Sequence, residues 1–178
     1  MRLAILCLAL VACPKSGGGG TDTVAAPKAA AESATAELTS LGGGNLHGTV
    51  TFTKQDSGIL VKIKIDDAAP GTHGIHIHEG GDCGDDGKNA GAHFNPDNHD
   101  HGDPSANNHH NGDLGNIEVD ANGHGDKTMT VTEGFGLGTG DRSVLNRTVI
   151  FHEKKDDMQT QPGGDSGERR ACGVIKAN

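Results

Sequence analysis

The stretches Leu46–Thr53 (LHGTVTFT) and Ile59–Ile65 (ILVKIKI) decide the fold class. In the first, Leu, Gly, Val and Phe alternate with His and Thr; in the second, Ile and Val alternate mainly with Lys. A period of two residues is typical of a β-strand that buries one face. We therefore expect both stretches to be strands with one face in a core.

The same period recurs from about Ser33 onward, with clusters of Gly, Asn and Asp between the runs. The pattern does not predict an amphipathic helix anywhere in this part of the chain. Short strands alone predict an all-β sandwich or barrel. The eight expected strands are Thr35–Leu41, Leu46–Thr53, Ile59–Ile65, Gly74–Glu79, Asp113–Val119, Asp126–Thr132, Thr148–His152 and Cys172–Lys176.

Two polar segments, Gly80–Asn111 and Glu153–Arg170, are too long to be turns between strands. Long loops on a rigid β scaffold commonly carry function. We expect the functional residues of the chain to lie in or beside these two loops.

The composition excludes several classes of protein. The 178 residues suit one domain, and the absence of Trp and Tyr, with only 4 Phe, predicts a small aliphatic core without stacking platforms for bases. A net charge of −9 argues against nucleic acid or an anionic membrane surface as a partner. The 11 histidines are the unusual feature of the composition.

The beginning of the chain predicts export. Residues 1–12 (MRLAILCLALVA) have the short apolar run of a signal peptide, and the run ends in LVAC, which resembles the site cleaved by bacterial lipoprotein signal peptidase. We expect Cys13 to carry the lipid and to be the only attachment to a membrane; the alternative is an ordinary secretory leader. Residues 13–32 are expected to form a flexible tether before a domain over residues 33–178.

Besides Cys7 in the leader and Cys13 at its end, two cysteines remain, Cys83 and Cys172. In an exported protein, two cysteines indicate one disulfide. Two free thiols are the alternative.

The stretch Gly74–His78 (GIHIH) places two metal-binding side chains together. Because side chains alternate along a strand, His76 and His78 point to one face and the two Ile to the other. Imidazole suits copper and zinc, and three imidazoles with one carboxylate make a closed tetrahedral zinc set. A single His-x-His is weak evidence, but further candidate ligands follow at His93, His101, His110, Asp113 and His152.

Five segments carry a family resemblance: Gly71–Cys83 (GTHGIHIHEGGDC), Gly91–Pro104 (GAHFNPDNHDHGDP), His109–Asp120 (HHNGDLGNIEVD), Gly140–Asp157 (GDRSVLNRTVIFHEKKDD) and Glu168–Ile175 (ERRACGVI). In this order, from about Thr35 to Ile175, the chain resembles the copper–zinc superoxide dismutase family. The position of Cys83, directly after Gly81 and Asp82, is similar to that in bacterial members.

The resemblance implies an eight-stranded Greek-key barrel or sandwich of immunoglobulin-like type that dismutates superoxide with Cu(2+)/Cu(+) and Zn(2+). Superoxide would reduce copper and leave as dioxygen, and a second superoxide would reoxidise it and leave as hydrogen peroxide. His93 would bridge the metals and take up a proton between these steps. The resemblance assigns copper to His76, His78, His93 and His152, and zinc to His93, His101, His110 and Asp113. It implies that the carboxylate of Asp156 hydrogen-bonds one copper-binding and one zinc-binding histidine, and that Arg169 binds the anion. It also implies a disulfide between Cys83 and Cys172.

Neighbouring residues leave some alternatives open. His99 and His109 adjoin expected ligands, and Arg170 adjoins Arg169. The loop Glu153–Arg170 is shorter than in eukaryotic relatives and lacks their charged guiding segment. Lys154 and Lys155 are candidates for attracting the anion in its place. We expect His47 and His124 to be solvated, and His73 to be a buried structural histidine, because it shares its strand face with Ile75 and Ile77.

We therefore predict an exported, lipid-anchored antioxidant enzyme of the periplasm or cell surface. The rival hypothesis is a lipoprotein that stores or delivers copper or zinc without turnover. A store has no need of an anion-binding arginine beside a bridging histidine, so Arg169 favours the enzyme. The sequence leaves open whether the protein is a monomer or a homodimer, and which membrane would hold the anchor.

Overall fold

The computed structural model describes residues 30–178. The predicted signal peptide (residues 1–12), Cys13 and most of the predicted tether (residues 13–32) lie outside the described residues. Among residues 30–178, no helix is both long and apolar enough to cross a membrane.

Eight strands form a nearly closed antiparallel barrel, which confirms the predicted all-β fold. Their order around the barrel is β5-β4-β7-β8-β1-β2-β3-β6. Connections from β3 to β4 and from β6 to β7 join strands that are not neighbours, as in a Greek key. The strands are β1 (Ser33–Ser40), β2 (His47–Gln55), β3 (Gly58–Asp66), β4 (Gly71–His78), β5 (Asp113–Val119), β6 (Gly125–Val131), β7 (Thr148–His152), β8 (Arg169–Val174) and the short β9 (Lys176–Ala177), which pairs with β1.

The last predicted strand, Cys172–Lys176, differs from the structure. β8 begins earlier, at Arg169, and ends at Val174, and β9 follows after Ile175. The backbone of Ile175 donates to the carbonyl of Arg147 and accepts from the amide of Asn146, so this residue leaves the ladder with β1. The alternating pattern could not reveal the early start, because two charged arginines open the strand.

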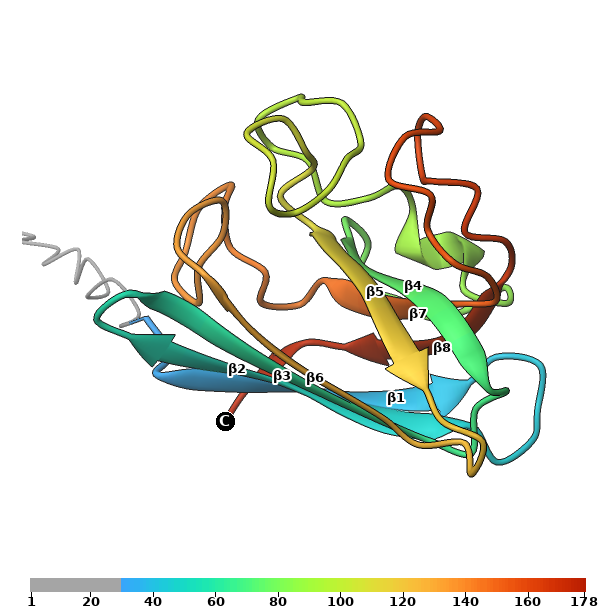
Figure 1. Cartoon of the computed structure of the whole chain (residues 1–178). Helices are drawn as coiled ribbons and strands as arrows, with labels where there is room; N and C mark the ends of the chain where they lie inside the picture. Colours follow the sequence, from blue (N-terminus) through green and yellow to red (C-terminus); the bar gives the residue numbers. More distant parts are fainter. Residues whose placement is uncertain (1–29) are drawn as a thin grey trace, which may run out of the picture.

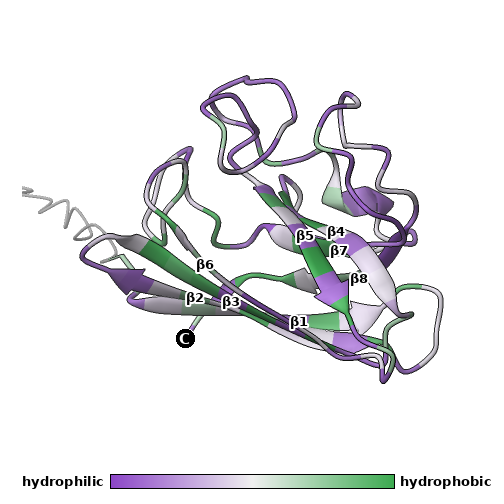
Figure 2. Ribbon diagram, in the orientation of Figure 1, coloured by the Kyte–Doolittle hydropathy of each residue, from purple (hydrophilic) through white to green (hydrophobic). Residues whose placement is uncertain are grey.

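The core is small and aliphatic, as the composition predicts. Ile59, Val61, Ile63 and Ile65 of β3 are all buried. The apolar residues in Figure 2 follow the strands, and the long loops are mainly polar. All four phenylalanines of the chain are buried, at positions 52, 94, 135 and 151.

A third loop, residues 132–147, also contributes to the core, which the sequence pattern did not predict. Its residues Phe135, Leu137 and Val144 are buried. The ring of Phe135 meets Phe52 edge to face, with the centroids 6.1 Å apart. This loop therefore packs against the core of the barrel.

β4 connects the core with the loops. Ile75 and Ile77 join the main hydrophobic cluster, while His76 and His78 are buried on the opposite face. Both faces are covered because two long loops rise from the same side of the barrel (Figure 1). These loops were predicted at Gly80–Asn111 and Glu153–Arg170, and in the structure they span residues 79–112 and 153–168.

The disulfide between Cys83 and Cys172 is present, as predicted, with Cα atoms 5.8 Å apart. It joins the loop of residues 79–112 to β8 across 89 positions of sequence. Ala90, Ile150 and Cys172 form a second small buried cluster there. The bridge thus fixes the loop to the strand that begins with Arg169.

Candidate metal centre

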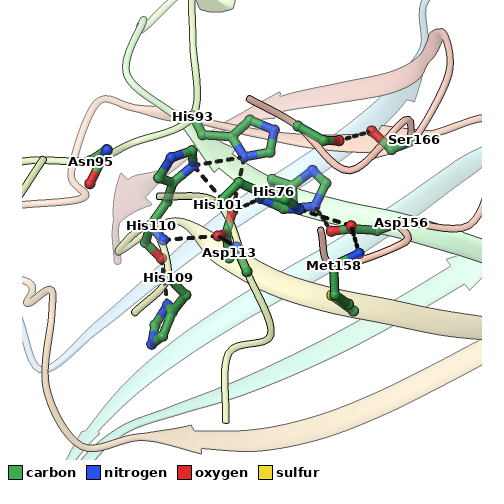
Figure 3. A network of polar contacts seen from close by, with 12 residues as sticks. His76, His93, Asn95, His101, His109, His110, Asp113, Asp156, Met158 and Ser166 are labelled. Carbon is green, nitrogen blue, oxygen red and sulfur yellow. Dashed lines mark hydrogen bonds and ion pairs between the residues drawn. The ribbon is translucent and has the colours of Figure 1, made fainter. Parts of the chain in front are cut away.

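Two groups of side chains could each hold a metal ion, and within each group the ligand atoms lie within 4.8 Å of one another. Both groups include His93, so they are adjacent (Figure 3). Strands β4 and β7 supply three histidines of the first group. The loop of residues 79–112, together with the start of β5, supplies all four residues of the second group. The groups are His76, His78, His93 and His152, and His93, His101, His110 and Asp113.

The second group has the dimensions of a zinc site. Asp113 Oδ1 lies 2.9 Å from His93 Nδ1, 3.0 Å from His101 Nδ1 and 3.6 Å from His110 Nδ1. Tetrahedral zinc with bonds of about 2.0–2.1 Å separates its ligand atoms by roughly 3.3 Å. These four side chains therefore fit a tetrahedral zinc ion, and they are largely screened from solvent.

The first group presents unpartnered nitrogens. His76 Nδ1, His78 Nε2 and His152 Nε2 are buried and have no hydrogen-bond partner. A buried polar atom without a partner is costly, and it calls for an explanation such as a bound ion. Three imidazole nitrogens converging in this way fit a copper ion.

The remaining nitrogen of each of these histidines faces an oxygen atom. His76 Nε2 lies 2.7 Å from Asp156 Oδ2, and His78 Nδ1 lies 3.0 Å from the carbonyl of Gly91. Such contacts place the imidazole proton on the outer nitrogen and leave the inner one free to bind a metal.

Asp156 joins the two groups. Its Oδ1 lies 2.9 Å from His101 Nε2, while its Oδ2 contacts His76. The backbone of Asp156 is held by Asn116, which accepts from its amide at 2.8 Å and donates to its carbonyl at 2.9 Å. The sequence pattern does not reveal this role of Asn116, although the residue lies within the segment His109–Asp120 that carries the resemblance.

Burial sets the electrostatics of the first group. It lowers the pKa of His78 and His152 well below their usual range, and it lowers the pKa of His93 to about 4. These imidazoles are neutral at pH 7, as metal ligands must be. At His101 burial also acts downward, but hydrogen bonds to two carboxylates outweigh it and raise the pKa to about 9.

The two carboxylates remain ionised in spite of their burial. Burial alone would raise the pKa of Asp113 and of Asp156. Hydrogen bonds from the surrounding imidazoles reverse this effect and hold both pKa values below the usual range. The centre thus keeps two negative charges beside its histidines.

A pocket of about 870 Å³ opens onto both groups and is lined by His78, His93, His110 and His152. Arg169 also lines it and donates to the carbonyls of Gly87 and Gly91.

Comparison with known proteins decides the family. Residues 46–175 match copper/zinc superoxide dismutase (SODC). The chain belongs to the copper/zinc superoxide dismutase family.

Named relatives agree with this assignment. The chain is 40% identical over 136 residues to an extracellular copper–zinc superoxide dismutase of Caenorhabditis elegans, covering 73% of this chain and 61% of that protein. It is 39% identical over 141 residues to superoxide dismutase [Cu-Zn] A of Xenopus laevis, covering 75% of this chain and 91% of that protein. An extracellular enzyme of Drosophila melanogaster is 40% identical over 136 residues, with 72% and 74% of the two chains covered.

A solved structure, that of the clock protein EA4, superposes with a TM-score of 0.76 at 35% identity. The match covers 84% of this chain and 97% of that one. The predicted family, fold and cofactors are confirmed: this is an oxidoreductase of the copper–zinc superoxide dismutase type.

The structure places neighbouring candidates apart. His101 and His110 belong to the second group, whereas His99 and His109 are outside both groups and bond to backbone carbonyls. Arg170 does not line the pocket, and its Nη1 lies 3.5 Å from Glu168 Oε2.

The other histidines take structural positions. His73 is buried, and its ring nitrogens lie 3.0 Å from the carbonyl of His152 and 2.8 Å from that of Ala69. His47 and His124 are exposed beside Asp66. These positions agree with the roles expected from the sequence.

The cations of the pocket differ from expectation. Lys154 and Lys155 are exposed and do not line it. Arg147, which the sequence analysis missed, does line it and lies 4.1 Å over the ring of Phe94. It also donates to the carbonyl of Glu79 at 2.9 Å, and so connects the start of β7 to the loop that carries His93. Only the tertiary structure brings this arginine to the pocket.

Proposed function

We propose that the chain converts two superoxide anions and two protons into dioxygen and hydrogen peroxide. Copper would bind His76, His78, His93 and His152, and zinc would bind His93, His101, His110 and Asp113. The observation that carries the proposal is that His93 is common to both groups and lies in the same pocket as Arg169. When bound, copper supplies one-electron exchange between Cu(II) and Cu(I), and zinc supplies a redox-silent positive charge.

His93 is suited to handle a proton. Its Nδ1 contacts Asp113, so Nε2 is the nitrogen left for the other three histidines. A proton held or released at Nε2 reaches the pocket directly, because His93 lines it. We propose that His93 gives this proton to the reduced oxygen species and regains one from solvent.

Arg169 would bind the anion. It is partly buried, and the carbonyls of Gly87 and Gly91 orient its guanidinium at the pocket wall. A planar guanidinium offers both charge and hydrogen bonds to a small anion. Asp156 would hold His76 and His101 in place at the same time.

The decisive experiment measures superoxide decay by pulse radiolysis on the protein loaded with copper and zinc. Arg169→Ala should lower the catalytic rate constant by roughly 10- to 100-fold, which corresponds to the loss of one charge-assisted hydrogen bond of about 1.5–3 kcal/mol. Arg170→Ala is the matched control and should leave the rate within twofold. Absence of turnover at full metal occupancy would overturn the proposal and favour a metal store.

We also propose export, with attachment to a membrane through a lipid on Cys13. The apolar run of residues 1–12, the following cysteine and the extracellular relatives support this proposal. The periplasm or cell surface of a bacterium is the location that fits the lipoprotein-like leader. Partition into detergent should be lost in Cys13→Ala, and an unchanged soluble fraction would refute the anchor.

A further inference from the structure

Ser166 contacts a histidine of the first group from the loop of residues 153–168. Its Oγ lies 3.2 Å from His152 Nδ1, and Ser166 is itself buried, with 5% of its surface exposed. The backbone fixes this residue, because the carbonyl of Ser166 accepts from the amide of Lys154 at 2.8 Å. The hydroxyl is therefore held against the imidazole.

The direction of the hydrogen bond follows from the proton count. A serine hydroxyl has one hydrogen, and Ser166 Oγ donates it to the carbonyl of Gly163 at 2.9 Å. The oxygen can then only accept from His152 Nδ1. The proton of this imidazole is thereby placed on Nδ1, and Nε2, which is buried and unpartnered, keeps its lone pair for a metal.

His152 Nδ1 has two oxygen acceptors within reach, whereas the outer nitrogens of His76 and His78 have one each. His76 faces a carboxylate at 2.7 Å and His78 faces a carbonyl at 3.0 Å. The second acceptor near His152 Nδ1, the carbonyl of Gly167, is 3.4 Å away. Ser166 is therefore the closer of its two acceptors.

The neighbouring backbone leaves space for this serine. A Cβ at Gly74 would lie 3.1 Å from Ser166 Cβ and 3.2 Å from Asp156 Cβ. A glycine in β4 thus lets the serine and the carboxylate approach the strand that carries His76. The contact is part of the packed site.

We propose that Ser166 is a positioning residue that sets the tautomer and orientation of His152 toward copper. This inference rests on the proposed assignment of copper to the first group, and it makes the loop of residues 153–168 part of the copper site. In this proposal Ser166 acts through His152 and is not itself a metal ligand.

The test compares Ser166→Ala with Ser143→Ala in the otherwise native protein. Ser143 is a matched control, because its hydroxyl donates to Gly138 and accepts from Leu145 in a different loop. Copper and zinc dissociation constants are measured by chelator competition, and the Cu(II) environment by electron paramagnetic resonance. Removing the hydrogen-bond partner of a metal-binding histidine typically lowers metal affinity 10- to 100-fold.

In Ser166→Ala we expect the copper dissociation constant to rise about 10-fold or more, with an altered Cu(II) spectrum, and the zinc constant to stay within threefold. Ser143→Ala should match the native protein in all three measurements. A copper constant within threefold of native would overturn the proposal, as would an equal rise of the zinc constant, which would indicate a general loosening of the loop. Neither affinity depends on turnover, so a native protein that binds copper without dismutating superoxide would refute the proposed function alone.

Discussion

Replacing Asp156 by Ala should weaken zinc binding more than copper binding. The carboxylate is fully buried and lies 2.7 Å from His76 Nε2 and 2.9 Å from His101 Nε2. Alanine leaves both imidazoles without their acceptor, so neither is held in the tautomer that frees its inner nitrogen. The two histidines are nevertheless supported differently by the backbone.

His76 is paired on both sides within the barrel, with Asp113 of β5 and Ile150 of β7. His101 lies in a loop, where its backbone amide and carbonyl bond to the side chain of Gln161. Without the carboxylate, His76 stays on its strand while His101 can turn away. We expect the zinc dissociation constant to rise 10- to 100-fold, about 1.4–2.7 kcal/mol, and the copper constant to rise less than 10-fold.

The assay is chelator competition for each metal in turn, with circular dichroism as a check on the fold. Asp157→Ala is the matched control, because this neighbouring carboxylate is exposed and bonds to Thr160 and Gln159 instead of a histidine. A zinc constant within threefold of native in Asp156→Ala would refute the reasoning. So would a copper constant that rises more than the zinc constant.

Three further predictions follow from the same geometry. The pKa of His101 is about 9, so zinc must displace a proton from this imidazole when it binds at pH 7. The affinity of the metal-free protein for zinc should therefore rise about tenfold per pH unit between pH 7 and 9 and level off above pH 9. A flat pH profile in a competition titration would contradict this. The double substitution Cys83→Ser and Cys172→Ser should lower the free energy of unfolding, measured in urea, by about 4–5 kcal/mol, because the disulfide closes a loop of 89 residues. A loss below 1 kcal/mol would contradict this role of the disulfide. A Cβ at Gly164 would lie 1.8 Å from Asp156 Oδ1, so Gly164→Ala should reduce zinc affinity at least tenfold. The control is Gly140→Ala, which is also at positive φ but in open space and should leave zinc affinity unchanged. Equal zinc affinities in the two variants would refute the reasoning.

The alternating pattern predicts every strand except β8 and β9, and it also predicts the pair of ligands on β4. Alternation is a local property of extended backbone, so the pattern from Ile59 to Ile65 predicts which side chains are buried. The same rule places His76 and His78 on one face. The order of motifs also predicted the family, because the ligand types occur at characteristic intervals along the chain.

Tertiary structure alone decided the contacts made by the loops. The sequence did not predict that Ile175 would leave the β1 ladder, that Arg147 would reach the pocket, or that Ser166 would accept from His152. Each of these depends on hydrogen bonds between residues far from one another along the chain or on a loop conformation with no periodic pattern. Such positions are set by the long-range contacts that hold the loops against the barrel, and the strand period carries no information about them.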